Sequence, residues 1–580
     1  MAHAPSSKLE DWMRQGLSLH QTGRVAEAEP FYLRVLDKQP SHPAANHLLG
    51  LIRLQQGQPE SAVALIARAV LTRRDDPQYH CNLGVALNAA GQYARAVASL
   101  DRAIELQPDY AEAFSNRGMA FKNLGRPAEA VASYRQAIAL RPAEAGFHLN
   151  LGNALTDLGD LRAAESSYRK ALELRPWYPA ALAGLCLTLE ALNRSDEAVS
   201  VAEQATAAGP RVAEYHRSLG RAYRAAGRLD DAVASYRRTL ALDPRDAESF
   251  RLMSLLLRRA ALDDDMHAME RLLQEGDLSD EQQAQLHFAL GKGYDDLGDH
   301  LRSFDHFVRG NQVQRRYAPF SLEGALQEFA AIERLFADAD ALPRLATTDA
   351  APIFIVGLPR SGKSSLEGML GRHARVQKGG ELPILANEVA AVWRQHGLAE
   401  PSASLDTVPP SELAAIGANY AREAATLAAP PLVLIDTMPL NFRHIGFIRL
   451  ALPNARVLHC VRDPLEHCAA MFQKYFARRG FEFASDLGEL AAYYRLYQRL
   501  MTHWHSVFPG FIRDVDMAAL RQNPEAQMRQ VLDFCGLDWD PACAAPYDPE
   551  PEIGAPIDVT PDMRSGRLEP YRNAMAGLLA

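Results

Sequence analysis

Cysteine is scarce in this chain of 580 residues, and no two cysteines stand in a C-x-x-C pair. Long apolar runs are also missing. The first residues, MAHAPSSKLEDW, contain no apolar signal core, and no later run has the length needed to span a bilayer. These absences argue against a disulfide scaffold and a membrane-spanning protein, so we expect a cytoplasmic protein with reduced, mostly buried thiols and no membrane partner. The six cysteines are Cys81, Cys186, Cys460, Cys468, Cys535 and Cys543.

Positive charge is not in surplus either. The formal net charge is −9 at pH 7, whereas a general nucleic-acid binder carries an excess of lysine and arginine. We therefore expect no nucleic-acid partner, and any basic site must be local. The chain is also too long for a single hydrophobic core, so two or more domains are expected.

Glycine, alanine and proline each recur at intervals of 34 residues in the first half of the chain. Such a period is typical of a helix–turn–helix unit that stacks on copies of itself. Glycine permits the left-handed turn between two helices, alanine lets them approach closely, and proline ends the second helix. One glycine column is interrupted once, where Asn193 fills the position. The glycines of that column are Gly23, Gly57, Gly91, Gly125, Gly159 and Gly227.

The stretch EAFSNRGMAFKNLGRPAEAVASYRQAIALRP resembles the tetratricopeptide repeat, and the resemblance covers residues 8–247 in seven units. The later stretch LHFALGKGYDDLGDHLRSFDHF keeps the pattern in a shifted register, which indicates an irregularity near residues 260–285. The resemblance implies an α-solenoid of tetratricopeptide repeats over residues 8–310. Stacked repeats leave a concave groove, which predicts a docking surface for a protein or peptide. A spacer or a dimerisation module is the alternative, and the oligomeric state stays open.

The pattern changes in the second half of the chain. Residues 311–350 have a helical composition and are expected to connect the solenoid to the next domain. After them, the short apolar runs PIFIVG, PLVLIDT, ARVLHCV and GFIRDVD are separated by helical stretches. This alternation predicts an α/β domain of the P-loop type with a mainly parallel sheet over residues 351–545. A proline-rich tail follows over residues 546–580.

A phosphate-binding sequence follows the first of these apolar runs. Residues 357–364, GLPRSGKS, match G-x-x-x-x-G-K-S and stand between a predicted strand and a predicted helix. Free backbone amides and the helix dipole hold an anion at such a place, and Arg360 and Lys363 add positive charge. One interpretation is an ATPase or kinase, in which Lys363 reaches the terminal phosphates and Ser364 binds magnesium. Asp436, at the end of PLVLID, would then be the second carboxylate beside the magnesium.

The longer stretch PIFIVGLPRSGKSSLEGMLGRHARVQKGGEL resembles the start of a sulfotransferase domain. LPNARVLHCVRDPLEHCAAMFQKYF resembles the second signature of that family, and LDFCGLDW resembles a third landmark. The resemblance spans residues 352–545, and repeats joined to such a domain are a known bacterial arrangement. In the family, the loop P-R-S-G-T-T holds the 5′-phosphosulfate of 3′-phosphoadenosine 5′-phosphosulfate (PAPS). Lys363 stands where threonine is usual. The residues that match the loop are Pro359, Arg360, Ser361, Gly362 and Ser364.

The resemblance implies PAPS as the co-substrate and gives a role to each part of the site. Arg462 is expected to grip the 3′-phosphate of PAPS. Glu381, in GGEL, stands where protein-tyrosine sulfotransferases carry their catalytic carboxylate, and it would accept the proton of the acceptor hydroxyl. Arg360 and Lys363 would stabilise the charge of the leaving phosphate and the transferring group, with no metal required. The implied acceptor is a protein or peptide captured by the repeats, and tyrosine is one candidate for its hydroxyl.

Three departures from the family pattern leave room for another function. Thr437 stands where the family often has a lysine in a D-K-M-P stretch, and we hypothesise that Lys363 supplies the missing charge. Ala470 stands where a serine is usual, which removes one contact with the 3′-phosphate and about 1 kcal/mol of binding. The C-terminal family signature is not recognisable in EIGAPIDVTPDMRSGRLEPYR. A non-catalytic scaffold, with repeats that bind a partner, is therefore a further alternative.

Histidines and cysteines form two weaker groups in the second half. His503 and His505 are two residues apart on a predicted helix, so their side chains point to different sides and do not readily share a metal. The other group straddles a strand and the start of the next helix, where buried packing is the favoured interpretation. Its members are His459, Cys460, His467 and Cys468.

Overall fold

The computed structural model describes residues 5–192, 194–340, 342–343, 345, 348–428, 431–477, 480–545 and 567–575. The chain divides into two compact units, Met1–Pro210 and Arg211–Ala580, and each is described by itself. None of the described helices is both long and apolar enough to cross a membrane.

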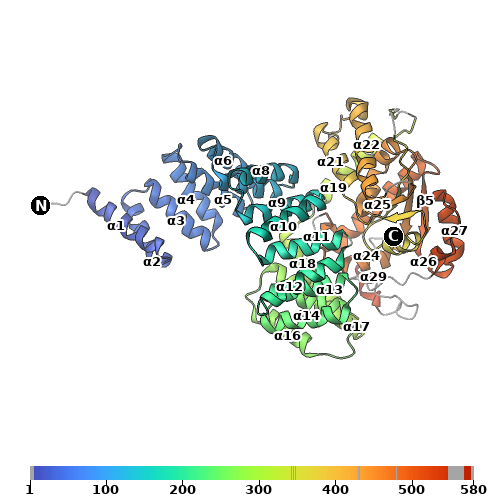
Figure 1. Cartoon of the computed structure of the whole chain (residues 1–580), viewed down its shortest axis with the longest axis horizontal. Coiled ribbons are helices and arrows are strands. Elements are labelled where there is room, and N and C mark those ends of the chain that lie inside the picture. Colours follow the sequence, from blue (N-terminus) through green and yellow to red (C-terminus); the bar gives the residue numbers. More distant parts are fainter. Residues whose placement is uncertain are drawn as a thin grey trace. The chain divides into compact units, whose positions relative to one another are not determined.

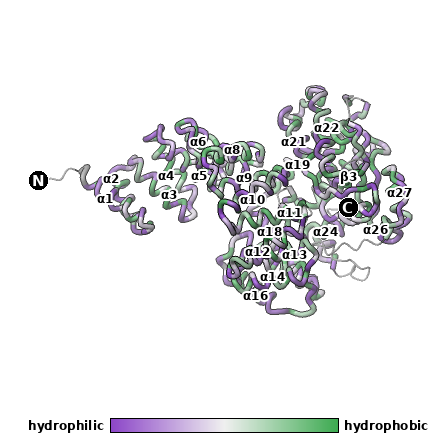
Figure 2. Tube along the Cα trace, viewed as in Figure 1, coloured by the Kyte–Doolittle hydropathy of each residue, from purple (hydrophilic) through white to green (hydrophobic). Residues whose placement is uncertain are grey.

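The first unit consists of helices in successive pairs (Figure 1). Hydrophobic and hydrophilic residues alternate along these helices (Figure 2), as expected of helices with one buried face. The helices are α1 (Pro5–Gln21), α2 (Val25–Lys38), α3 (Pro43–Gln55), α4 (Pro59–Thr72), α5 (Pro77–Ala89), α6 (Tyr93–Leu106), α7 (Ala111–Asn123), α8 (Pro127–Leu140), α9 (Ala145–Leu158), α10 (Leu161–Leu174), α11 (Pro179–Ala191) and α12 (Ser195–Ala208).

The repeating glycines explain how each pair of helices forms. Gly57 stands between α3 and α4 with φ 71°, in the left-handed region that favours glycine. A second glycine column serves close packing, because a Cβ atom on Gly152 would lie only 2.6 Å from Cε1 of Tyr168. The ring of Tyr168 therefore packs directly on the backbone of α9. The predicted helix–turn–helix repeat is confirmed.

The second unit begins with further helices of the same kind. α15 ends at Leu256, and the next helix starts only at Asp264, which agrees with the irregularity expected near residue 260. α17 and α18 have 17 and 18 residues, more than any helix from α2 to α16, and α18 continues without a break through residue 310. The helices are α13 (Ala213–Ala225), α14 (Leu229–Leu242), α15 (Ala247–Leu256), α16 (Asp264–Glu275), α17 (Asp280–Asp296), α18 (His300–Tyr317) and α19 (Leu322–Leu335).

The rest of the second unit is an α/β domain with a five-stranded parallel sheet in the order β2-β3-β1-β4-β5. The mainly parallel sheet predicted from the alternating runs is confirmed. The strands are β1 (Ile353–Val356), β2 (Val376–Lys378), β3 (Val433–Asp436), β4 (Arg456–Val461) and β5 (Ile512–Asp516). The helices are α20 (Lys363–Leu370), α21 (Ile384–Gln395), α22 (Pro410–Leu427), α23 (Ile445–Ala451), α24 (Pro464–Phe472), α25 (Leu487–Val507), α26 (Met517–Gln522), α27 (Pro524–Cys535) and α29 (Glu569–Met575). Short 3₁₀ helices are η1 (Leu405–Thr407), η2 (Pro439–His444), η3 (Glu482–Ser485) and η4 (Pro541–Ala544).

Strand order makes the carboxyl end of β1 the expected place for a ligand. β1 lies in the middle of the sheet, with β3 on one side and β4 on the other. Ligands of open parallel sheets bind at the carboxyl ends of the strands where the connections diverge in this way. All four residues of β1 are buried, because helices cover both faces of the sheet. The loop after β1 therefore starts from a rigid base.

The last repeat helices pack against the α/β domain within the second unit. The side-chain amide of Asn311 on α18 donates a hydrogen bond to the carbonyl oxygen of Phe472 at 2.8 Å. Gln314, one turn later, donates to the carbonyl oxygen of Phe476 at 2.6 Å. Arg567, near the C-terminus, pairs with Asp295 of α17 at 2.6 Å, and both side chains are almost fully buried. Most of the predicted proline-rich tail, residues 546–566 and 576–580, lies outside the described residues.

Candidate active site

The predicted phosphate loop connects β1 to α20. Its backbone is tightly folded, since Gly357 has φ 145°, Arg360 has φ 68° and Gly362 has φ 103°. A Cβ atom on Gly357 would lie 2.8 Å from Oγ of Ser361, so only glycine fits there without a shift. Arg360 has a side chain, so its left-handed backbone conformation is strained. Strained backbone of this kind is often found in functional loops. The loop is therefore compact and ends at the N-terminus of α20.

Two polar side chains turn toward the inside of this loop. Lys363 is only 6% exposed, and its Nζ donates a hydrogen bond to the carbonyl oxygen of Leu358 at 3.1 Å. Ser361 is fully buried, and no group of the described residues hydrogen-bonds to its hydroxyl. A buried hydroxyl without a partner is costly, which suits a position where a bound anion accepts its hydrogen. The loop thus fits the phosphate group that its sequence predicts.

The segment after β4 holds the loop from the other side. Nη1 of Arg462 donates a hydrogen bond to the carbonyl oxygen of Arg360 at 3.2 Å, and its Nε lies 3.6 Å from the carboxylate of Glu466. Burial lowers the pKa of the Arg462 guanidinium, and the negative charge of Glu466 opposes that shift. His467 lies one turn into α24, and its Nε2 is 2.8 Å from the carbonyl oxygen of Pro359. Burial lowers the pKa of His467 to about 3, so the ring is neutral and donates this hydrogen bond through Nε2.

Glu381 stands in the turn that follows β2, and backbone hydrogen bonds hold this turn beside the carboxyl end of β3. The backbone N–H of Gly379 donates to the carbonyl oxygen of Ile435 at 2.9 Å, and the N–H of Thr437 donates to the carbonyl oxygen of Gly380 at 2.8 Å. A Cβ atom on Gly379 would lie 2.5 Å from the oxygen of Ile435, and Gly380 has φ 68°. The two glycines of GGEL are therefore needed for this turn. The side chain of Glu381 is exposed.

The turn is also tied to the helix that follows the phosphate loop. The N–H of Gly380 donates to Oε1 of Glu367 on α20 at 2.9 Å. Glu367 lies four residues after Lys363, so the same helix carries the end of the phosphate loop and a support of the Glu381 turn. The structure thus brings the loop, Arg462 and the Glu381 turn together around the carboxyl ends of β1, β3 and β4.

Asp436 supports the same turn from inside the protein. Its side chain is 0% exposed, and it accepts hydrogen bonds from Tyr420 Oη at 3.2 Å and from the N–H of Met438 at 2.9 Å. The N–H of Leu382 is a further backbone donor to this carboxyl. Burial raises the pKa of Asp436 to about 7. The carboxyl oxygens of Asp436 are already engaged by these three donors, which argues against the role of magnesium ligand that the ATPase interpretation gives it.

Sequence reasoning missed three supports of the site. Glu367 and His467 bind the backbone of residues that are distant in the sequence, and Tyr497 of α25 forms a hydrogen bond with the backbone of Leu358. No motif marks Glu367 or Tyr497. His467 is one of the four histidines and cysteines for which the sequence predicts buried packing, and burial is confirmed for all four.

The two residues that depart from the family pattern also lie in this region. Thr437 is buried behind the turn and Ala470 is half-buried on α24.

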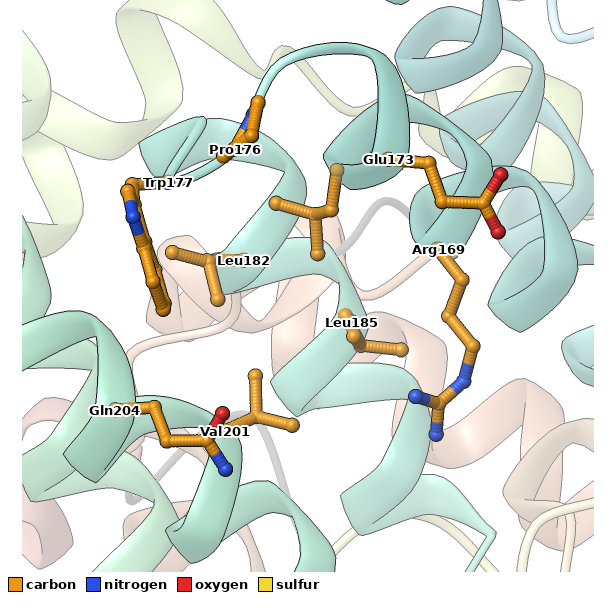
Figure 3. A pocket seen from close by; sticks show the side chains of 9 residues that line it. Arg169, Glu173, Pro176, Trp177, Leu182, Leu185, Val201 and Gln204 are labelled. Atoms are coloured by element: carbon orange, nitrogen blue, oxygen red, sulfur yellow. The ribbon is translucent and has the colours of Figure 1, made fainter.

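A separate hollow lies on the repeats of the first unit. It has a volume of about 360 Å³ and is lined by residues of α10, α11 and α12. Figure 3 shows Trp177 at one end, with Leu182, Leu185 and Val201 between it and Arg169. Trp177 has φ 60° and a 42% exposed side chain, and it stands in the turn between α10 and α11. An apolar hollow of this size can enclose one or two apolar side chains.

Comparison with known protein families agrees with both halves of this description. Residues 352–541 match the model described as "Sulfotransferase family". Residues 19–83, 84–125, 115–179 and 187–247 match models of the tetratricopeptide repeat. The chain carries tetratricopeptide repeats followed by a sulfotransferase-family domain. The resemblance found on the loop, the R-D-P segment and the LDFCGLDW stretch is thereby confirmed at the level of the family.

Individual relatives are more distant. An "Uncharacterized protein" of Aquifex aeolicus (strain VF5) is 28% identical over 291 residues, which cover 47% of this chain and 37% of that protein. "Protein-tyrosine sulfotransferase 2" of Gallus gallus is 24% identical over 190 residues, which cover 32% of this chain and 51% of that protein. The chain thus spans about half or less of the length of these relatives. The crystal structure of MamA is 22% identical, with 28% of this chain and 96% of that chain covered, at a TM-score of 0.26.

Proposed function

We propose that this protein is a PAPS-dependent sulfotransferase that moves a sulfuryl group to an acceptor hydroxyl. The observation that carries the proposal is the buried, partnerless hydroxyl of Ser361 in a loop flanked by Lys363 and Arg462, within a sulfotransferase-family domain. A loop with backbone amides, a lysine and an arginine at the N-terminus of a helix suits a phosphosulfate.

The loop residues have distinct roles in this proposal. The backbone N–H groups of residues 360–364, with the hydroxyls of Ser361 and Ser364, hold the 5′-phosphosulfate, and Pro359 shapes the start of the loop. Lys363 and Arg360 stabilise the negative charge that gathers on the leaving phosphate during transfer. Lys363 leaves its hydrogen bond with the carbonyl oxygen of Leu358 to do so. Arg462 binds the 3′-phosphate, and the buried surroundings of its guanidinium strengthen that ion pair.

Glu381 is the proposed general base. Its carboxylate is exposed on a turn that is tied to α20 and β3, so the turn has little freedom to move. A base must lie within hydrogen-bond reach of the proton that it accepts, and a rigid turn beside the phosphate loop favours such a position. The proton of the acceptor hydroxyl passes to Glu381 while the acceptor oxygen bonds to sulfur and the phosphate oxygen leaves. The proposal requires no metal in this step.

The proposed acceptor is a protein or peptide bound by the repeats in the cytoplasm, and tyrosine is the first acceptor to test. Support comes from the tetratricopeptide repeats, which generally bind proteins or peptides, and from the similarity to a protein-tyrosine sulfotransferase.

We further propose a division of the chain into four parts. They are a repeat solenoid over residues 8–310, a helical connector over 311–350, a transferase domain over 351–545 and a tail over 546–580.

A non-catalytic scaffold is the second candidate, and one observation favours it. Thr437 directly follows β3, at the edge of the sheet that carries the proposed site. The family often has a lysine at this position, so a positive charge is missing there. The two candidates differ in how they are expected to treat PAPS. An enzyme binds PAPS and turns it over, whereas a scaffold loses one or both of these properties.

Calorimetric titration of the full chain tests the proposal. The titrants are 3′,5′-adenosine bisphosphate, which is the product left by PAPS, and ATP with magnesium. We expect the bisphosphate to bind and Arg462→Ala to weaken it by at least about tenfold, as expected for the loss of a charged hydrogen bond. Arg449→Ala is the matched control, because Arg449 is exposed on α23. A preference for ATP with magnesium would support the ATPase interpretation, and binding of neither would support the scaffold.

A further inference from the structure

Three side chains that lie far apart in the sequence meet at one edge of the sheet. They are His459 on β4, His505 near the end of α25 and Asp514 on β5. Nδ1 of His459 lies 2.7 Å from Oδ1 of Asp514, and Nε2 of His505 lies 2.9 Å from the same oxygen. One nitrogen of each ring and one carboxylate oxygen thus all lie within 4.8 Å of one another.

The strand register creates this meeting point. His459 and Asp514 are direct partners in the parallel pairing of β4 and β5, so their side chains point to the same face of the sheet. α25 covers that face, and its last turns bring His505 beside the pair. Within the described residues, no other three His, Cys, Asp or Glu side chains bring their ligand atoms this close together.

We propose that His459, His505 and Asp514 bind a divalent metal ion of the zinc class. Two imidazoles and one carboxylate are a ligand set that zinc accepts, with a water molecule in the fourth position. A metal ion can reach the site from solvent, because His505 is partly exposed and Asp514 is exposed. His459 forms the buried side of the site. Ligand atoms at bond lengths of about 2.0–2.2 Å from an ion lie about 3.4 Å from one another, so each histidine nitrogen needs to move away from Oδ1 of Asp514 by only a fraction of an ångström.

The second nitrogen of His459 strengthens this assignment. Nε2 of His459 forms a hydrogen bond with the hydroxyl of Tyr497, which is 3% exposed. A ring that binds a metal through Nδ1 carries its proton on Nε2 and donates it to a fixed partner, and Tyr497 is placed to accept it. In the absence of metal, the same proton lies on Nδ1 and is donated to Asp514. Metal binding therefore reverses the direction of the hydrogen bond between His459 and Tyr497.

The site lies close behind the phosphate loop. Tyr497, which contacts His459, also forms a hydrogen bond with the backbone of Leu358 in that loop. The metal site is nevertheless outside the proposed catalytic machinery and does not depend on the proposed function. Its occupancy can be measured without PAPS or an acceptor.

The test is metal titration of the full chain after removal of bound metals with a chelator. Zn²⁺ is titrated by calorimetry, and Co²⁺ is followed by the visible absorption bands that four-coordinate cobalt gives. We expect one site of this kind per chain, with affinity reduced at least about tenfold in His505→Ala and in Asp514→Asn. Asp514→Asn keeps an oxygen that can accept hydrogen bonds, which protects the fold. His503→Ala is the matched control, because His503 lies on the same helix but binds the carbonyl oxygen of Phe336 instead.

Two results would overturn the proposal. One is the absence of cobalt bands and of zinc binding in the wild-type chain. The other is binding that is equally strong in the wild-type chain, His505→Ala and Asp514→Asn, because the ion would then lie elsewhere.

Discussion

The carboxylate of Glu367 accepts a hydrogen bond from the backbone N–H of Gly380 at 2.9 Å. This contact joins the helix after the phosphate loop to the turn that carries Glu381. Because Lys363 and Glu367 lie one helical turn apart on α20, the position of the loop and the position of the proposed base are mechanically linked. Glu367 is thus a positioning residue in the proposed reaction.

Removal of that contact should impair transfer more than binding. We expect Glu367→Ala to lower kcat about tenfold or more, since a hydrogen bond to a charged group contributes about 1.5–3 kcal/mol. The dissociation constant of 3′,5′-adenosine bisphosphate should change little. Glu367→Gln keeps an accepting oxygen and should restore most of the activity. Equal loss in both variants, or a loss confined to binding, would contradict this role.

Lys363→Thr restores the residue that is usual in the family loop, and we expect it to abolish transfer. Thr437 supplies no positive charge, so Lys363 is the proposed source of the charge on the leaving phosphate. We expect the fold to survive, because threonine removes the hydrogen bond to the carbonyl oxygen of Leu358 but puts no larger side chain into the loop. Turnover is measured with PAPS, and thermal unfolding reports the fold. Lys170→Thr, on an exposed helix of the repeats, is the control, and retained turnover in Lys363→Thr would refute the hypothesis.

The repeats and the phosphate loop could be predicted from the sequence because their signals are local. The 34-residue period brings each glycine to a turn or to a close helix contact, and both uses are seen at Gly57 and Gly152. GLPRSGKS likewise predicts a loop between a strand and a helix, and the structure has β1 and α20 on either side. In each case the residues that matter are neighbours along the chain.

The supports of the site could not be predicted, because they depend on contacts between distant segments. Glu367 meets Gly380, and His467 meets Pro359, only after the sheet has formed. The partners of Asp436, which argue against its interpretation as a magnesium ligand, could not be predicted for the same reason. The sequence places it correctly at the end of a strand, but only the structure shows that Tyr420 covers it. His505 does not share a site with His503, as the sequence predicts, and its neighbours His459 and Asp514 lie on β4 and β5, where no local pattern points to them.

Glu381→Gln tests the proposed base directly. The variant keeps the size of the side chain and its hydrogen-bonding capacity but cannot accept a proton, so we expect kcat to fall about 10²–10⁴-fold. Bisphosphate affinity and the unfolding temperature should stay unchanged, because the side chain is exposed. Glu400→Gln, another exposed glutamate of the same domain, is the matched control. Activity close to that of the wild type would show that another group accepts the proton.

The buried carboxyl of Asp436 predicts how stability depends on pH. Burial raises its pKa from 3.8 to about 7, so the folded protein holds this proton to a higher pH than the unfolded chain does. Ionisation of this group in the unfolded chain, while the folded protein keeps its proton, therefore lowers the stability of the fold as the pH rises from about 4 to 7, by about 4 kcal/mol in full.

Asp436→Asn removes this pH dependence, because the amide has no proton to lose. We expect the stability of the variant relative to the wild type to increase from pH 4.5 to pH 7.5. Calorimetric or denaturant unfolding of both proteins at the two pH values measures this difference, in which the contributions of all other titrating groups cancel. Asp533→Asn, at an exposed position on α27, should show no such trend. A difference between Asp436→Asn and the wild type that stays constant over this range would mean that Asp436 is already ionised in the folded protein at pH 4.5.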